Sequence, residues 1–240
     1  MKKQLANPLV YQLYACGGIL CMILQAVYLA AEDDKGLLPR LHWTLILSGI
    51  LVAVALTIAI FVGKERRFPQ RPAKLRALGG AMGALGIFVA AVSMMIDGDW
   101  TTAVPALLAG GAVGYIALCR YRRQRCHFLT YGVGAVFLMF YLISHYRLWS
   151  AEPESGRYVL RLLALVFLML GFYQKAALGA GVGNPGAHHV FSTVALLLSF
   201  AAIPGADHPS LFLGMGIWLL LDPTVRVRKK IKRQVSNETA

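Results

Sequence analysis

The residues best suited to chemistry in this 240-residue chain lie between positions 141 and 161, where two long apolar runs meet. Tyr141 and His145 are four residues apart, which places them on one face of a helix. Arg161 stands inside an apolar run, and an ionisable residue in a membrane segment indicates a functional site by default. A histidine beside a carboxylate can change its charge near neutral pH, so this group predicts a site for a ligand or a proton. The candidate ligand-binding residues are Tyr141, His145, Arg147, Glu152, Glu154 and Arg161.

Arg161 also has a purely structural interpretation. It lies about one helical turn inside the expected membrane boundary, and a long basic side chain can extend from there to water along its aliphatic stem. It could instead pair with Glu152 or Glu154 in the preceding loop. The ligand-site hypothesis requires Arg161 to face the helix bundle, within reach of Tyr141 or His145.

Other polar motifs give little indication of a metal or cofactor site. His188 and His189 are adjacent, and Cys126 precedes His127, but their spacing matches no standard zinc pattern. The glycine-rich segment at 181–186 has the spacing of a dinucleotide fingerprint, yet it follows a membrane helix where that fingerprint needs a strand. We therefore expect neither a metal nor a cofactor. Because the chain has no intramembrane H-E-x-x-H or G-x-S-x-G motif, the sequence favours a protein that is not an enzyme.

The elements that must position the 141–161 group are long apolar helices. The chain is 58% hydrophobic, its mean hydropathy is +0.60, and its apolar residues fall mostly in runs of about 20, the length that crosses a bilayer as a helix. The runs are Leu9 to Ala31, Trp43 to Gly63, Leu75 to Ile96, Trp100 to Cys119, Phe128 to Leu148, Tyr158 to Tyr173, Val190 to Ile203 and Ser210 to Leu221. This pattern predicts an all-α polytopic membrane bundle of eight transmembrane helices. Because the last two runs are short, the alternative is six crossings followed by a C-terminal re-entrant hairpin.

The charges between the runs alternate in sign. Most basic residues lie at the two ends of the chain or in the breaks after every second run, such as 64–76 and 120–125, and most acidic residues lie in the other breaks. Since basic residues in short loops stay cytoplasmic, both termini are expected to lie in the cytoplasm. The membrane is expected to be a cell membrane of the bacterial inner-membrane type. The formal charge of +13 then reports orientation and attraction to anionic lipid at the cytoplasmic face, and no nucleic-acid partner is expected.

The domain organisation follows from the same pattern. We expect residues 1–224 to form a single transmembrane domain and residues 225–240 a basic cytoplasmic tail. Small residues recur at helical spacing in the third and fourth runs, and they let helix backbones approach closely in lipid. Because only residues 97–99 separate these two runs, they are expected to pack as a tight antiparallel hairpin.

Two functional hypotheses remain at this point. In the first, the protein binds or transports a small solute, on its own or as the membrane subunit of a transport complex with a partner protein. In the second, it is a non-transporting sensor, scaffold or regulator whose basic face binds lipid or a partner. A polar site inside the bundle near His145 and Arg161 would favour the first hypothesis.

Overall fold

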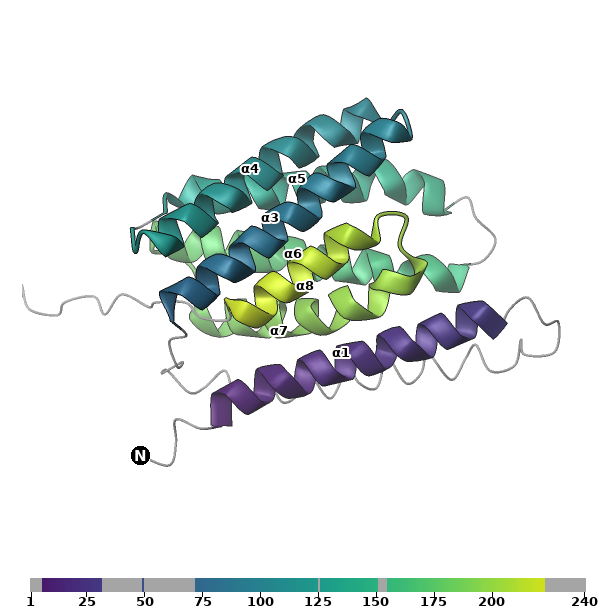
Figure 1. Ribbon diagram of the computed structural model, residues 1–240, viewed down its shortest axis with the longest axis horizontal. Coiled ribbons are helices and arrows are strands. Elements are labelled where there is room, and N and C mark those ends of the chain that lie inside the picture. Colours follow the sequence, from purple (N-terminus) through teal and green to yellow (C-terminus); the bar gives the residue numbers. More distant parts are fainter. Residues whose placement is uncertain (1–5, 32–48, 50–71, 125, 151–154, 223–240) are drawn as a thin grey trace, which may run out of the picture.

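A computed structural model describes residues 6–31, 49, 72–124, 126–150 and 155–222 of the chain. Within these ranges the protein is all-helical, with seven α-helices and no strand (Figure 1). Five of the helices are long and apolar enough to cross a membrane, and two shorter apolar helices accompany them. The chain is therefore a helical membrane bundle, as the sequence predicts.

The helices extend beyond several of the apolar runs that predict them. Their bounds are α1 Ala6–Ala31, α3 Ala73–Ile96, α4 Trp100–Tyr121, α5 Phe128–Ser150, α6 Ser155–Ala180, α7 Pro185–Ala202 and α8 Pro209–Leu221, with a 3-10 turn at Ile203–Gly205. Helix α6 ends just before Gly181, which has a positive φ of 87°. The side chain of Asn184 then caps α7 by accepting a hydrogen bond from the Gly186 amide at 2.9 Å. The glycine-rich segment at 181–186 is thus the turn between two helices.

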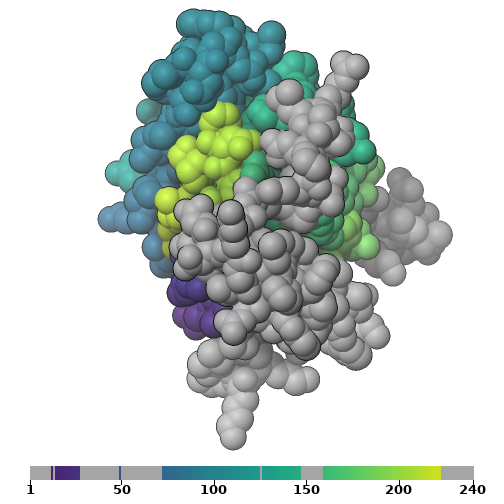
Figure 2. All heavy atoms as spheres, turned by 90° about the vertical axis from the view of Figure 1, so that its right-hand side faces the viewer, coloured from purple at the N-terminus to yellow at the C-terminus, as the bar shows by residue number. Residues whose placement is uncertain are grey.

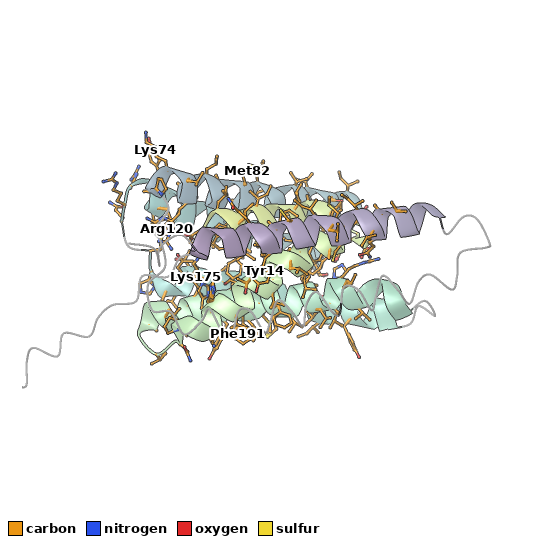
Figure 3. The ribbon with its side chains drawn as sticks, turned by 90° about the horizontal axis from the view of Figure 1, so that it is seen from below. Tyr14, Lys74, Met82, Arg120, Lys175 and Phe191 are labelled. Atoms are coloured by element: carbon orange, nitrogen blue, oxygen red, sulfur yellow. The ribbon has the colours of Figure 1, made fainter. Side chains whose placement is uncertain are left out.

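Successive helices run between the same two ends of the bundle (Figure 1). The end at which α1 and α3 begin and α4 ends carries basic side chains, and we call it the basic end. Lys74, Arg120 and Lys175 gather there (Figure 3). The opposite end carries Asp97 and Asp99 in the α3–α4 turn and Asp207 before α8; we call it the acidic end. The alternation of charge along the sequence is therefore a separation of charge in space.

Six helices close into a ring of neighbours. Helix α3 contacts α4, and contacts continue from α4 to α5, α6, α7 and α8 in turn, until α8 returns to α3. Helix α1 packs outside this ring against α7. The core includes the fully buried side chains of Ile87, Met94, Phe137, Leu165 and Phe212.

Helix α8 is short and mostly enclosed. Leu211, Phe212, Met215 and Trp218 are all buried, which fits a segment that is apolar all round. The helix begins at the acidic end, beside Asp207, and stops at Asp222 at the basic end. Its 13 residues cover about 20 Å at the usual rise of about 1.5 Å per residue.

The glycines of α3 divide between two neighbours. Gly80 packs on Ala117 of α4, where an added Cβ would lie 3.0 Å from the Ala117 Cβ, so α3 and α4 form the expected hairpin. Gly86 instead faces α8: a Cβ there would lie 2.5 Å from the Ser210 carbonyl oxygen and 2.7 Å from the Gly214 Cα. Several of the α3 glycines that the sequence places against α4 therefore contact α8 instead.

Two expected elements lie outside the described residues. The apolar run Trp43 to Gly63 is described only at Gly49, and the basic tail at 225–240 is not described at all. Both stay predictions from the sequence.

The contact between Gly86 and Gly214 generates a stability prediction. Gly86→Ala should destabilise the protein by about 2 kcal/mol, because the new methyl group meets backbone atoms that can move only if the helices separate. Gly111→Ala is the matched control: Gly111 is exposed within α4 with open space around its Cα, so alanine should be neutral or stabilising. Thermal unfolding in detergent measures both variants. Equal midpoints for the two would show that α3 and α8 do not touch at Gly86.

Candidate functional site

The predicted pair on α5 stands at the acidic end of the bundle. The rings of Tyr141 and His145 are stacked with their centroids 4.0 Å apart, and both side chains are buried. His145 Nδ1 lies 3.0 Å from the Tyr141 carbonyl oxygen, to which it donates because a carbonyl can only accept. In the neutral ring, this hydrogen bond leaves Nε2 as an acceptor.

Arg161 forms an ion pair that the sequence analysis did not include. Its Nη1 donates to Asp207 Oδ1 at 2.9 Å, which joins α6 to the connection between α7 and α8. The Arg161 side chain is 11% exposed and that of Asp207 is 47% exposed. The partners expected from the sequence, Glu152 and Glu154, lie outside the described residues.

Two further buried side chains complete this group. The His208 ring makes edge contacts with Tyr141 and His145, at centroid distances of 6.2 and 6.3 Å. Gln25 approaches from α1: a Cβ on Gly205 would lie 3.2 Å from Gln25 Nε2 and 3.7 Å from Arg161 Nε. We call Gln25, Tyr141, His145, Arg161, Asp207 and His208 the acidic-end cluster.

The acidic-end cluster contains buried polar atoms without a hydrogen-bond partner among the residues that the structure describes. These atoms are Gln25 Oε1 and His208 Nδ1. Burial lowers the pKa of His208, and His145 lowers it further, so the ring is neutral at neutral pH. A buried unpaired polar group costs about 1–3 kcal/mol, and a bound polar molecule or water would remove that cost.

Asp99 provides a negative charge at the edge of this end. Its carboxylate accepts hydrogen bonds from Thr101 Oγ1 at 2.6 Å and from Thr102 Oγ1. These bonds lower the pKa of Asp99, and His145 contributes a smaller effect in the same direction. Asp99 therefore carries its negative charge at neutral pH.

The structure brings together three of the six residues predicted for the site. Tyr141 and His145 touch directly, and Arg161 joins them through Asp207, whose neighbour His208 contacts both rings. The side chain of Arg147 and the whole of Glu152 and Glu154 lie outside the described residues. The sequence analysis missed Gln25, Asp207 and His208 because they come from segments far from 141–161, although the polar stretch at 204–209 between two apolar runs was a visible signal.

A second polar cluster lies at the basic end. Lys175 Nζ donates to Asp222 Oδ2 at 2.9 Å, and Arg120 Nη2 lies 3.5 Å from the same oxygen. Arg120 Nη2 also donates to the Tyr131 hydroxyl at 3.1 Å. The side chains of Lys175 and Asp222 are 8% and 0% exposed. With Trp218, these residues of α4, α5, α6 and the end of α8 form the basic-end cluster.

Lys175 is enclosed by aromatic rings as well as by charge. Its Nζ lies 4.9 Å from the Trp218 ring centroid and 5.5 Å from that of Tyr131, within the range of cation–π attraction. In the sequence, Lys175 follows the apolar run Tyr158 to Tyr173 and Asp222 follows the run Ser210 to Leu221. Only the packing of α6 beside the end of α8 turns these two residues into a buried pair.

The histidine and cysteine motifs have local roles. His188 Nδ1 lies 3.2 Å from the Gly171 carbonyl oxygen and so links α7 to α6. Cys126 Sγ donates to the Ile116 carbonyl oxygen at 3.8 Å, and burial raises the pKa of its thiol to about 12. In the part of the chain that the structure describes, no three His, Cys, Asp or Glu residues are placed to hold one metal ion.

Comparisons with protein-family models, with curated proteins and with solved structures found no match to this chain. The two clusters of polar side chains are therefore the features that indicate function.

The difference in burial between the two ion pairs generates a prediction. Asp222→Asn should destabilise the protein by about 3 kcal/mol, because it leaves the buried Lys175 without its counter-charge. Asp207→Asn should cost less than about 1 kcal/mol, since Asp207 is half-exposed and water screens its pair. Thermal unfolding of both variants in the same detergent measures the difference. A larger loss for Asp207→Asn would contradict the ranking.

Proposed function

We propose that this chain is an eight-crossing protein of the cell membrane that binds a small polar solute in the acidic-end cluster, as a transport protein or as the membrane subunit of a transport complex. One observation carries the proposal. Buried polar side chains from α1, α5, α6 and the α7–α8 connection converge at one end of the bundle, and Gln25 Oε1 and His208 Nδ1 have no hydrogen-bond partner among the described residues. Packing alone does not require such a group, since buried polar groups are normally hydrogen-bonded.

The course of the helices supports eight crossings. Helix α1 ends at the acidic end and α3 begins at the basic end, and eight crossings require one more crossing between these two points. The apolar run Trp43 to Gly63 has the length for this crossing. Helix α7 leads to the acidic end, where Asp207 forms its ion pair, and α8 leads to the basic end, where Asp222 forms its own. That separation favours two crossings over a re-entrant hairpin.

Charge supports the orientation. Arg122, Arg123 and Lys74 are exposed at the basic end, and basic residues in short loops remain on the cytoplasmic side. The acidic end, with its solute site, then faces outward, and both termini of an eight-crossing chain lie inside.

The side chains of the site indicate what kind of solute it takes. Gln25 Oε1 needs a hydrogen-bond donor, and His208 Nδ1 can accept or donate. Arg161 offers a planar guanidinium, which grips a carboxylate or phosphate better than a lysine does. A small molecule with both an acidic group and a hydrogen-bond donor satisfies these demands. Its acidic group takes the place of the Asp207 carboxylate beside Arg161, and Asp207 moves toward water.

The orientation is tested by cysteine labelling in a variant without the four natural cysteines. A membrane-impermeant thiol reagent should modify Asp97→Cys only from outside the cell, and Arg122→Cys only after the membrane is opened, because the two exposed positions lie at opposite ends. Modification of Asp97→Cys from the cytoplasmic side alone would show that the orientation is the opposite one.

The solute site is tested at Gly205, where a new side chain would meet Gln25 and Arg161. In the same cysteine-free background, a small cationic thiosulfonate applied outside should modify Gly205→Cys at least tenfold faster than Gly111→Cys. Gly111 is the control because it is exposed in the middle of α4, toward lipid. If Gly205→Cys is inert while Asp97→Cys reacts, the acidic-end cluster is sealed, and the non-transporting sensor or scaffold hypothesis is favoured instead.

A further inference from the structure

The basic-end cluster carries an unbalanced positive charge. Arg120 and Lys175 both turn to one oxygen of Asp222, and the remaining partner, Tyr131, is neutral while protonated. Among the described residues, the other aspartates, at positions 97, 99 and 207, lie at the opposite end of the bundle. Two cations therefore share one anion inside a largely buried site, and an uncompensated buried charge costs several kcal/mol.

Polar atoms in the same cluster are also left without partners. Asp222 Oδ1, Arg120 Nε and Trp218 Nε1 are buried and make no hydrogen bond to any residue that the structure describes. Trp218 and Asp222 are one turn apart, and the exposed fractions of the two residues are 2% and 1%. The site thus presents two N–H donors and one oxygen that can only accept, beside an excess positive charge.

From these observations we propose that the basic-end cluster binds a small oxyanion that carries a proton, of the hydrogen phosphate type. The negative charge balances Arg120 and Lys175. The unprotonated oxygens of the anion accept from Arg120 Nε and Trp218 Nε1, and its hydroxyl group donates to Asp222 Oδ1. A fully ionised oxyanion such as sulfate has no hydroxyl to donate, and its oxygen would face the Asp222 carboxylate with like charge.

The surroundings allow an anion to arrive. The Arg120 side chain is 23% exposed, so the cluster is not closed at its α4 side. Arg122 and Arg123 are exposed in the turn that follows α4, and clustered positive charge raises the local concentration of anions. This site lies a bundle length from the acidic-end cluster, and its existence does not depend on the solute site proposed there.

The experiment measures the thermal unfolding of the full-length protein in a maltoside detergent at pH 7. Sodium phosphate, sulfate and chloride are compared at equal ionic strength. Phosphate should raise the unfolding midpoint in a concentration-dependent way, and sulfate and chloride should have much smaller effects. Lys175→Met and Arg120→Lys should each weaken the apparent phosphate affinity at least tenfold, whereas Arg122→Gln, at an exposed position of the same end, should leave it unchanged.

Asp222→Asn provides the sharpest variant, because an asparagine side chain can donate as well as accept. It should bind phosphate and sulfate with similar affinity, and either anion should restore part of its lost stability. A short-chain phosphatidic acid serves as a separate arm: affinity at least tenfold above that of inorganic phosphate identifies a lipid headgroup as the source, and lower affinity identifies a free solute.

Two results would overturn the proposal. One is a wild-type midpoint that is the same in phosphate, sulfate and chloride. The other is a phosphate effect that Lys175→Met and Arg120→Lys leave intact, which would place the anion elsewhere. Arg120→Lys keeps the charge and side-chain length of a site that is already partly exposed, so it gives an answer even if the other variants fail to fold.

Discussion

The two ends of α8 are tied to one helix, α6, by ion pairs at opposite ends of the bundle. Arg161 and Lys175 lie about four helical turns apart on α6, roughly 21 Å along its axis, which is close to the length of α8. At that spacing both side chains project from the same face. Their partners, Asp207 and Asp222, flank α8 directly. These two pairs, together with the close contact between Gly86 and Gly214, limit how far α8 can slide along its neighbours.

The two ion pairs differ in what they can do. The Lys175–Asp222 pair is buried and gains from low dielectric, but its desolvation cost is high, so its net stabilisation is smaller than its geometry suggests. The Arg161–Asp207 pair is open on the carboxylate side, and it can exchange partners at little cost. The buried pair therefore suits a fixed anchor, and the open pair suits a site whose ligand comes and goes.

Sequence reasoning reached the helical class, most of the membrane segments and the separation of charge, because each of these follows from local composition. It also placed Tyr141, His145 and Arg161 on neighbouring helices at one end. It could not find that Arg161 pairs with Asp207, 46 residues away, or that Lys175 pairs with Asp222, 47 residues away. Such pairs depend on which helices are neighbours, and apolar runs of similar length do not encode that order. Glycine spacing likewise predicted close packing in α3, but not that Gly86 would meet α8.

Charge fastens α8 at the basic end through Lys175 and Asp222, and a double-mutant cycle measures this interaction directly. Lys175→Met, Asp222→Asn and the double variant are compared with the wild type by unfolding in one detergent. A direct pair predicts that the double variant loses less stability than the sum of the two single losses, by about 2 kcal/mol or more, because neither charge is left buried alone. Additive losses within about 0.5 kcal/mol would show that Lys175 and Asp222 do not interact, and would contradict the account of how α8 is held.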